Sequence, residues 1–366
     1  MKIVFFSPYL TYKHAGGGEK HLFDTALATG QLGAQVFIAI SPLDQSRSFQ
    51  LTKHQKFYTE FMGKNLDALE FITTPLMTQA GLREKLLWTK NFDQLYYVTD
   101  GSLFFSLAKK NHLHIQVPFT TGQSTLVSRL KLKNWQVKNT NSKFTQQVIE
   151  ARWQTKIDFV HWPLVELDQF QPHQVKKEKL ILSVGRFFKQ LHSKRQDILI
   201  QAFIKLIHQN PKLMQGWRLV LVGAPEDQLW VRELKKMAKG YPVEFRHQVN
   251  RAKLIKLFQQ ASFYWHATGY KVNELKHPEK VEHFGITTVE AMAAKALPLV
   301  VPKGGQKEVL GKKLIKLLAW QEVDELVAKT ASLIKNSPNL EADFASQIKP
   351  FSQDAFNRRV MQMFQL

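Results

Sequence analysis

Two glutamates eight positions apart flank a glycine and open a helical segment in the second half of the chain. The stretch reads Glu282-His-Phe-Gly285-Ile-Thr-Thr-Val-Glu290 and continues into Ala-Met-Ala-Ala. Glu290 falls in the first turns of the expected helix, where unpaired backbone N–H groups favour an anionic ligand. A carboxylate there can accept hydrogen bonds from ribose hydroxyls, and Glu282 can meet a sugar. Both glutamates are equally explained as surface residues that the helix dipole favours.

Two cations follow a short apolar run in the same half of the chain. Ser183-Val-Gly185-Arg186-Phe-Phe ends that run, and Lys194 stands just ahead of the next helical segment. An arginine fork grips phosphate oxygens at two points, and a lysine adds a point charge, so the two together suit a diphosphate. Arg186 taken alone is explained as well by an ordinary exposed cation.

Two glycine turns are the remaining motifs that can carry chemistry. Gly16-Gly17-Gly18-Glu19 follows the first apolar run, and Lys303-Gly-Gly-Gln-Lys-Glu308 follows a late one. Backbone N–H groups at such glycines can approach an anion closely. The first turn lacks both G-x-G-x-x-G and Gly-Lys-Ser/Thr, which disfavours a dinucleotide-binding or P-loop site, and a simple mobile turn stays an alternative.

The elements around these motifs alternate between apolar runs and helical spacing, which predicts α/β domains with parallel sheets. In the first half the pattern predicts a helix over Glu19–Leu32 and strands over Lys2–Phe6, Gln35–Ile40, Gln94–Val98, His114–Val117, Gln136–Asn139 and Phe159–His161. In the second half it predicts helices over Gln196–His208, Arg251–Gln260 and Thr288–Ala294, and strands over Leu180–Val184, Trp217–Val222, Val243–Phe245, Ala261–His266 and Leu297–Val301.

A polar stretch, Asp168–Lys179, carries Pro172 and three lysines near its end and is predicted to be a linker. The expected architecture is two Rossmann-like, doubly wound domains, at 1–170 and 171–350, with a C-terminal helix at about 351–366 that packs back on the first. Ligands of such sheets bind at the carboxyl ends of the strands. The site is therefore expected in a central cleft that the two domains face.

The order and spacing of these blocks resemble the family 4 glycosyltransferases, which have the GT-B fold. The resemblance covers most of the chain, from Gly-Gly-Gly-Glu through ILSVGRFF and KRQDILIQAF to EHFGITTVEAMAAKALPLVVPKGGQKEVL. Within the family, HFGITTVEAMAA is most similar to the branch that includes lipid-linked oligosaccharide mannosyltransferases. The resemblance implies a retaining hexosyltransferase that moves a hexose from a UDP- or GDP-linked donor to a glycan, lipid-linked or other hydroxyl acceptor.

The resemblance also implies roles for the matching positions. Arg186 and Lys194 would hold the donor diphosphate and stabilise the leaving group. Glu290 would bind the nucleotide ribose, and Glu282 would contact the transferred sugar. The other implied donor-binding residues are Gly17, Gly18, Gly185, His266, Gly269, Phe284, Gly285 and Ile286.

The chain departs from the family pattern in two places. The spacing between Arg186 and Lys194 is lengthened by a few residues. In the acceptor-side loop, where many members carry a histidine, the matching position is Gln116, with His114 two residues earlier. No Asp-x-Asp pair is present, so the sequence requires no metal, and no cofactor is expected beside the nucleotide-sugar substrate.

The charge suggests anionic partners without choosing among them. The formal net charge is +21, and residues 101–149 hold seven Lys/Arg and no acid. A basic nucleic-acid-binding protein is the alternative of a different class, but no recognition helix, zinc module or aromatic RNA-binding strand is visible. A GT-B nucleotide-sugar epimerase is the nearer rival. Leu126, Val127 and Leu130, interleaved with cations, suit contact with an anionic membrane.

The expected location is the cytoplasm, with peripheral contact at the inner face of the membrane. Cysteine is absent, which fits a reducing compartment. The first apolar run, Ile3–Phe6, is too short for the core of a signal peptide. No apolar stretch has the length of about 18 residues that a spanning helix needs.

Overall fold

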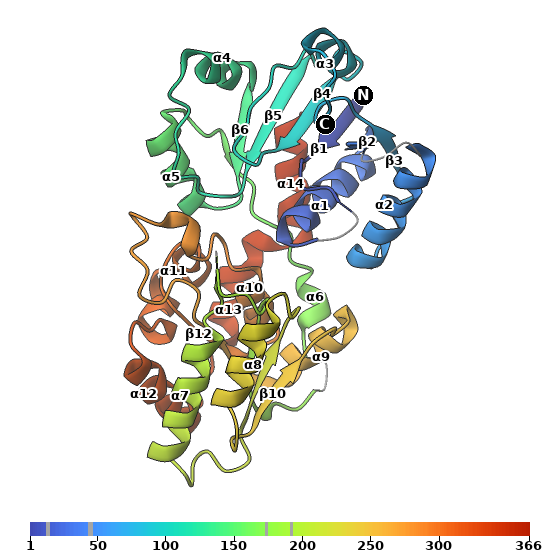
Figure 1. Cartoon of the computed structure of the whole chain (residues 1–366). Helices are drawn as coiled ribbons and strands as arrows, with labels where there is room; N and C mark the ends of the chain where they lie inside the picture. Colours follow the sequence, from blue (N-terminus) through green and yellow to red (C-terminus); the bar gives the residue numbers. More distant parts are fainter. Residues whose placement is uncertain (12–14, 43–46, 173–174, 191–192) are drawn as a thin grey trace. The chain divides into compact units, whose positions relative to one another are not determined.

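The computed structural model describes residues 1–11, 15–42, 47–172, 175–190 and 193–366, with the backbone alone for 47–50. It divides into two compact units (Figure 1). Unit 1 comprises Met1–Leu164 and Asp354–Leu366, and unit 2 comprises Val165–Gln353. Each unit has one sheet, and every strand pairing among the described residues is parallel. The predicted fold class, two α/β domains with parallel sheets, is confirmed.

The sheet of unit 1 has seven strands in the order β3-β2-β1-β4-β5-β6-β7. The chain starts at the middle of this sheet, winds outward to β3 and then returns past β1 to the other side. This reversal next to β1 is the switch point of a doubly wound sheet. The strands are β1 Lys2–Phe6, β2 Gln35–Ile40, β3 Leu69–Thr73, β4 Gln94–Val98, β5 Lys110–Ile115, β6 Val137–Thr140 and β7 Phe159–Val160.

Alternate side chains of β1 belong to two different cores because successive residues of a strand point to opposite faces. Ile3 and Phe5 pack in one buried cluster, and Val4 and Phe6 in the other. A strand that is buried on both faces needs apolar residues at every position, which explains the unbroken run Ile-Val-Phe-Phe. The helices of this unit are α1 Gly17–Gln31, α2 Arg47–Met62, α3 Leu82–Thr89, α4 Leu126–Asn134, α5 Lys143–Trp153 and α14 Gln353–Phe364.

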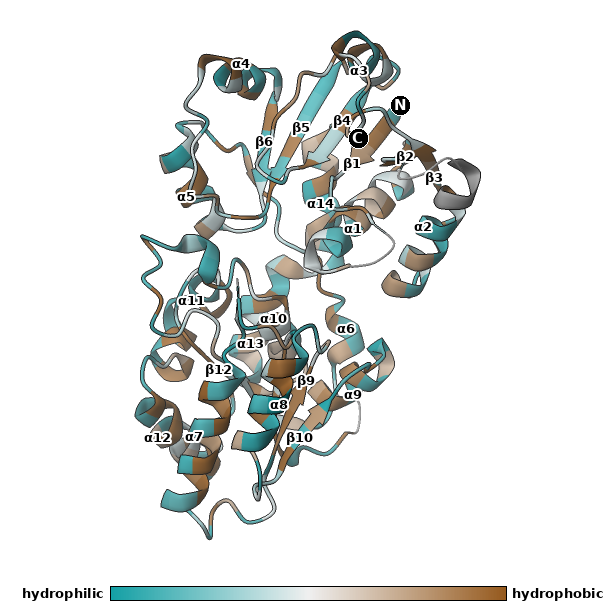
Figure 2. Ribbon diagram, in the orientation of Figure 1, coloured by the Kyte–Doolittle hydropathy of each residue, from teal (hydrophilic) through white to brown (hydrophobic). Residues whose placement is uncertain are grey.

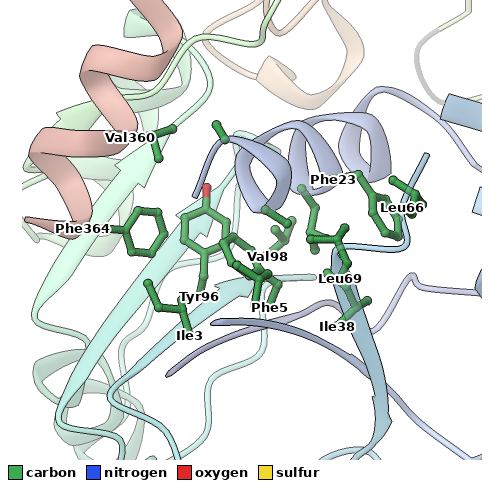
Figure 3. Close-up of a cluster of buried hydrophobic side chains, with 14 of the residues drawn as sticks. Ile3, Phe5, Phe23, Ile38, Leu66, Leu69, Tyr96, Val98, Val360 and Phe364 are labelled. Carbon is green, nitrogen blue, oxygen red and sulfur yellow. The ribbon is translucent and has the colours of Figure 1, made fainter. Parts of the chain in front are cut away.

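The last helix, α14, completes the first of these cores. Its Val360 and Phe364 lie against the β1 and β4 side of the sheet (Figure 3). The Phe364 ring stands 5.8 Å from Phe5 and 5.7 Å from Tyr96, between ring centroids. The final residues of the chain therefore fold with its first residues, and α14 belongs to unit 1 although it follows unit 2 in the sequence.

The sheet of unit 2 has five strands in the order β10-β9-β8-β11-β12. The strands β8 and β9 are buried apolar runs, which Figure 2 shows as brown where β9 is labelled. The strands are β8 Glu178–Val184, β9 Arg218–Val222, β10 Val243–Arg246, β11 Ala261–His266 and β12 Leu297–Val300. The helices are α6 Leu167–Phe170, α7 Gln196–Gln209, α8 Gln228–Met237, α9 Arg251–Gln260, α10 Ile286–Ala293, α11 Gln306–Leu318, α12 Val323–Asn336 and α13 Glu341–Ile348, with 3₁₀ turns at Pro278–Lys280 and Lys349–Phe351.

Most predicted elements are confirmed within two residues at each end. The predicted strand His114–Val117 is wrong in its bounds, because β5 begins at Lys110 and ends at Ile115. Polar residues at the start of that strand are buried, so its apolar pattern starts late. The predicted linker is also shorter than expected, since its ends belong to α6 and to β8, which starts at Glu178, while positions 173–174 lie outside the described residues.

The turn after β8 passes so close to β9 that only glycine fits at Gly223. A Cβ built on Gly223 would lie 2.0 Å from the carbonyl oxygen of Gly185. We expect Gly223→Ala to destabilise the protein by about 1–3 kcal/mol, because the backbone must move to relieve the overlap. Gly30 in α1 is the matched control, since its added Cβ would have only an ordinary contact of 3.7 Å with Val36.

We expect Gly30→Ala to stabilise the protein by about 0.5–1 kcal/mol, as alanine does in a helix. Urea unfolding of the two variants beside the parent protein measures both signs. Equal effects in the two variants would contradict the close approach of the two turns.

Candidate active site

The candidate site lies at the carboxyl edge of the unit 2 sheet, where its two central strands end side by side. β8 ends at Val184 and leads into Gly185 and Arg186, while the neighbouring strand β11 ends at His266. Parallel strands present their carboxyl ends at the same edge, so residues far apart in sequence meet there. Of the predicted residues, Gly185, Arg186 and His266 reach this edge directly from the strands.

Three of the predicted side chains form one polar cluster. The Lys194 Nζ lies 2.6 Å from Glu282 Oε2, and His266 Nε2 lies 3.0 Å from the same oxygen. Lys194 also lies against Gly185, because a Cβ there would be 2.4 Å from Lys194 Cγ. The structure therefore brings Lys194 to the site in spite of the lengthened spacing after Arg186, of which positions 191–192 lie outside the described residues.

The protonation of this cluster follows from its surroundings. Burial opposes ionisation of Glu282, but the Lys194 ammonium and the His266 hydrogen bond outweigh it and hold the pKa of that carboxyl well below its usual range. Burial lowers the pKa of His266, although Glu282 acts in the opposite direction. Near neutral pH the cluster thus holds an ionised carboxylate beside a neutral imidazole. The imidazole can donate from Nε2 to Glu282 while Nδ1 faces the Gln306 amide at 3.4 Å.

The second glycine turn holds the backbone of Glu282. Gly305 donates its N–H to the Glu282 carbonyl at 2.8 Å. A Cβ on Gly304 would lie only 2.1 Å from that same oxygen. The turn Lys303–Gly305 therefore leads into α11 and also fixes the backbone of Glu282, which precedes the loop at the start of α10. Gly269 approaches the same region, with its added Cβ 3.2 Å from Val281.

The loop after Glu282 ends at a helix start. Gly285 is the N-cap of α10 and has a φ of 110°, which a residue with a side chain rarely adopts. Ile286 is the first residue of the helix, and the N–H groups of Ile286 and Thr287 precede the first bond inside it, which Thr288 donates to the Gly285 carbonyl at 3.0 Å. Phe284 is buried, and its ring packs edge-on against Phe351 at 5.0 Å between centroids. Phe284 thus anchors the loop, while the N–H groups of the first turn can meet an anion.

Glu290 lies one turn into α10 and is 3% exposed. Arg251 Nη1 approaches its Oε1 to 2.7 Å, and the same guanidinium stacks over the Phe170 ring at 4.8 Å. Arg251 Nη2 also lies 4.0 Å from Glu166. The carboxylate of Glu290 is therefore held in place by a residue of α9 rather than lying loose at the surface.

Arg186 carries the most exposed of the predicted charges. Its Nη1 lies 3.2 Å and 3.3 Å from the two carboxylate oxygens of Glu226, and its side chain is 57% exposed. An ion pair this exposed contributes little to stability, so the guanidinium can exchange Glu226 for a phosphate at small cost.

The glycine turn of unit 1 is paired with one of the two acceptor-side positions. Gly17 and Gly18 begin α1, and the Glu19 carboxylate caps the turn by accepting the Gly16 N–H at 2.8 Å. A Cβ on Gly18 would lie 2.0 Å from Gln116 Nε2, so Gln116 rests on this turn. His114 instead lies inside the sheet in β5, fully buried, with its Nδ1 2.5 Å from Asn139 Oδ1.

Three residues of the site escaped the sequence analysis. Arg251 holds Glu290, Glu226 holds Arg186, and the fully buried Gln306 lies beside His266 and Gly285. Gln306 follows the glycine turn that the sequence does single out, so that turn is the one signal that could have found it. Arg251 and Glu226 have ordinary surface contexts in the sequence.

The family model of the glycosyl transferases group 1 matches residues 165–350, about half of the chain and nearly all of unit 2. The chain belongs to this family. The matched segment contains every unit 2 residue of the candidate site. Gly17, Gly18, His114 and Gln116 lie in unit 1, outside the match.

Curated relatives share part of the chain. The GDP-Man:Man(3)GlcNAc(2)-PP-Dol alpha-1,2-mannosyltransferase of Xenopus laevis is 28% identical over 240 residues, which cover 58% of this chain and 46% of the relative. The protein of the same name from Xenopus tropicalis is 33% identical over 140 residues, or 37% of this chain and 26% of the relative. The chain therefore spans less than half the length of these curated relatives.

Solved structures match the chain over its full length. The pneumococcal O-GlcNAc transferase GtfA, solved with UDP and GlcNAc, superposes with a TM-score of 0.70 at 11% identity and covers 100% of this chain and 99% of its own. WaaG, a glycosyltransferase involved in lipopolysaccharide biosynthesis, superposes with a TM-score of 0.62 at 15% identity and covers 99% of both chains. At this identity the likeness shows the fold, which is GT-B.

Two kinds of feature are absent from the described residues. No helix among them combines the length and the apolar character that crossing a bilayer requires. No three histidine or acidic side chains among them are arranged to hold a metal ion.

Proposed function

We propose that the chain transfers a hexose from a nucleotide-diphosphate sugar to a hydroxyl acceptor with retention of configuration, as a member of family 4. The observation that carries the proposal is the cluster of Lys194, Glu282 and His266 at the carboxyl edge of a GT-B sheet. Arg186 lies in the turn that follows β8, and the first turn of α10 supplies backbone N–H groups. The two cations suit a diphosphate, and the Glu282 carboxylate suits a sugar.

The cations act on the leaving group. As the bond between the anomeric carbon and the phosphate oxygen breaks, negative charge grows on the departing diphosphate. Lys194, Arg186 and the first-turn N–H groups of α10 would stabilise that charge, and they are held in place before the reaction begins. Glu290 would hold the ribose hydroxyls, with Arg251 fixing its orientation.

The carboxylate of Glu282 faces the opposite charge. The sugar becomes oxocarbenium-like as the diphosphate leaves, and an ionised carboxylate nearby stabilises it. Glu282 need not form a covalent bond, because the acceptor can attack from the face that the diphosphate leaves, with the departing phosphate taking the acceptor proton. His266 would keep Glu282 aimed at the sugar by donating to its Oε2.

The names of the relatives narrow the substrates to test first. The Xenopus proteins are named for a GDP-mannose donor and a dolichol-diphosphate oligosaccharide acceptor. We therefore propose GDP-mannose as the first donor and a lipid-linked glycan as the first acceptor, with UDP-linked hexoses as the second choice. We also propose that transfer needs no divalent metal, so EDTA leaves turnover unchanged.

The test is a donor screen of the purified chain. GDP- and UDP-linked hexoses are incubated with the protein, and nucleoside diphosphate release and thermal shift are measured for each. Binding should raise the melting temperature with only one base class, by ordinary ligand linkage. The anomeric configuration of the product, read by NMR with an acceptor that supports turnover, tests retention. A product of inverted configuration would overturn the assignment to a retaining family.

The alternatives predict other products. A nucleotide-sugar epimerase would release an isomerised nucleotide sugar without any acceptor. A nucleic-acid-binding protein would show salt-dependent retardation of DNA or RNA and no thermal shift with nucleoside diphosphates. Neither alternative is favoured, because neither explains both the match to the glycosyl transferase family and the cluster of Lys194, Glu282 and His266.

A further inference from the structure

The helix α4 in unit 1 presents large apolar side chains to solvent. Leu126 is 75% exposed, Val127 56% and Leu130 47%, whereas Leu132 of the same helix is 6% exposed and belongs to the core. A helix of nine residues with three exposed aliphatic side chains has an apolar face that the fold leaves uncovered. Figure 2 shows brown and teal together along this helix.

The exposed side chains share one side of the helix. At roughly 100° per residue, Leu126, Leu130 and Val127 fall within about 100° of one another, opposite Leu132. On the same wheel the cations flank this stripe, with Arg129 and Lys133 along one edge and Lys131 along the other. We call these six residues the α4 face: Leu126, Val127, Leu130, Arg129, Lys131 and Lys133.

The cations of the α4 face are not neutralised by the protein. Arg129 donates to the side-chain oxygen of Gln154 at 3.0 Å, a neutral partner. In the part of the chain that the structure describes, no carboxylate lies within ion-pairing distance of Arg129, Lys131 or Lys133. The sequence around them, residues 101–149, contains no acid at all. Neither an ion pair among the described residues nor an acid within this stretch of sequence therefore offsets the positive charge of the α4 face.

A further exposed leucine adjoins the end of α4. Ser106 donates its N–H to the Asn134 side chain at 2.7 Å, and Asn134 donates back to the Ser106 carbonyl at 3.1 Å. These bonds fix the loop that carries Leu107, which is 50% exposed. The loop that is hydrogen-bonded to the end of α4 therefore presents one more exposed apolar side chain.

We propose that the α4 face docks unit 1 on a membrane with anionic lipids. The aliphatic stripe would enter the boundary between headgroups and acyl chains, and the flanking cations would bind lipid phosphates with their aliphatic stems lying along the apolar layer. A protein partner would need a complementary acidic and apolar surface, which nothing on this chain specifies. An anionic bilayer needs only the two features present here, an apolar stripe and unpaired cations around it.

The test is vesicle flotation with the full chain. The probes are vesicles of phosphatidylcholine alone and of phosphatidylcholine with about a third phosphatidylglycerol. We expect binding to the anionic vesicles only, weakening as salt is raised. The triple variant R129Q/K131Q/K133Q should bind about 100-fold more weakly, since each cation near the surface contributes roughly fivefold. The variant L126S/L130S should bind at least about tenfold more weakly, because it loses apolar burial.

Matched control variants distinguish binding through the α4 face from nonspecific binding through other exposed lysines and leucines. K236Q/K239Q/K312Q removes three exposed lysines of unit 2, and L229S/L275S removes two exposed leucines there. Both controls should bind vesicles as the parent protein does. All variants should keep the nucleotide-dependent thermal shift, which separates a failure of docking from a failure of the proposed transferase function. Equal binding to neutral vesicles, no binding to either, or controls as weak as the α4 variants would overturn the proposal.

Discussion

Replacing Lys194 by methionine is expected to lower turnover by roughly 10²–10³ while the affinity for the donor changes much less. The reason is that the lysine meets a charge that grows only as the diphosphate departs. Methionine keeps the aliphatic part of the side chain, which packs against Gly185, and removes only the ammonium. The measurement is kcat and KM for the donor that the screen selects, with melting temperature recorded for each variant.

The contacts of Lys194 allow a purely structural explanation, and a second variant excludes it. Lys194 and Glu282 are 22% and 18% exposed and form a close ion pair, so loss of the lysine leaves a partly buried carboxylate next to His266 alone. If the lysine only neutralised Glu282, then K194M/E282Q would regain the activity that K194M loses. If both act on the donor, the double variant stays at least as slow as either single one.

A control for the loss of charge lies in the same unit. Lys189 pairs with Glu233 at 3.2 Å, and both side chains are more than half exposed. K189M should therefore leave turnover within about twofold of the parent, since exposed pairs of this kind contribute ~0–1 kcal/mol. Near-normal turnover in K194M would contradict the proposed role of Lys194 in stabilising the departing diphosphate.

The elements around the candidate site were predictable because their signals are local. Buried parallel strands need continuous apolar runs, and the runs at β1, β4 and β11 have the bounds that the sequence predicts. Glycines and glutamates at fixed places relative to those strands then located the cluster of Lys194 and Glu282. The parallel topology then explains why these residues meet, since parallel strands bring their carboxyl ends to one edge of the sheet.

The partners within the site were not predictable, because they depend on contacts between distant segments. Arg251 lies 39 positions from Glu290, and nothing in the start of α9 distinguishes it from other surface arginines. The start of β5 was missed because its residues are polar. Asn111 and His112 are typical of a loop in the sequence, but the structure buries them in the sheet, so the predicted strand began too late.

Those buried polar residues belong to a group of four histidines inside unit 1. His21, His112, His114 and His161 are each at most 1% exposed. The His21 ring stands 4.4 Å from His114 and 4.6 Å from His161, between centroids. They come from α1, β5 and the segment after β7, so no sequence spacing connects them.

Burial keeps these histidines neutral. It lowers the pKa of His112 to about 3 and of His114 to about 4, and it holds the pKa of His21 and His161 well below the usual range. Nearby positive charges, Lys20 and Arg359, act in the same direction on His21. In the unfolded chain the same side chains titrate near pH 6.5. Between pH 6.5 and about 4 the unfolded state therefore binds more protons than the folded state.

The expected result is a steep loss of unit 1 stability as the pH falls below 6.5. Each buried histidine contributes a slope of about 1.4 kcal/mol per pH unit once the unfolded side chain is protonated, so the four together approach an uptake of four protons on unfolding. Urea titrations at several pH values, followed by hydrogen exchange of the β5 amides, report the stability of this unit. Above pH 7.5 the four histidines contribute no pH dependence.

A single substitution tests the assignment to the buried group. His21 makes no side-chain hydrogen bond among the described residues, so His21→Phe removes its titration with little loss of contacts. The variant should gain about 2 kcal/mol relative to the parent between pH 7.5 and 5, because its unfolded state no longer takes up that proton. His277→Gln changes an exposed histidine of unit 2 and should leave the slope unaltered. An acid slope that His21→Phe does not reduce would contradict the assignment of that slope to the buried histidines.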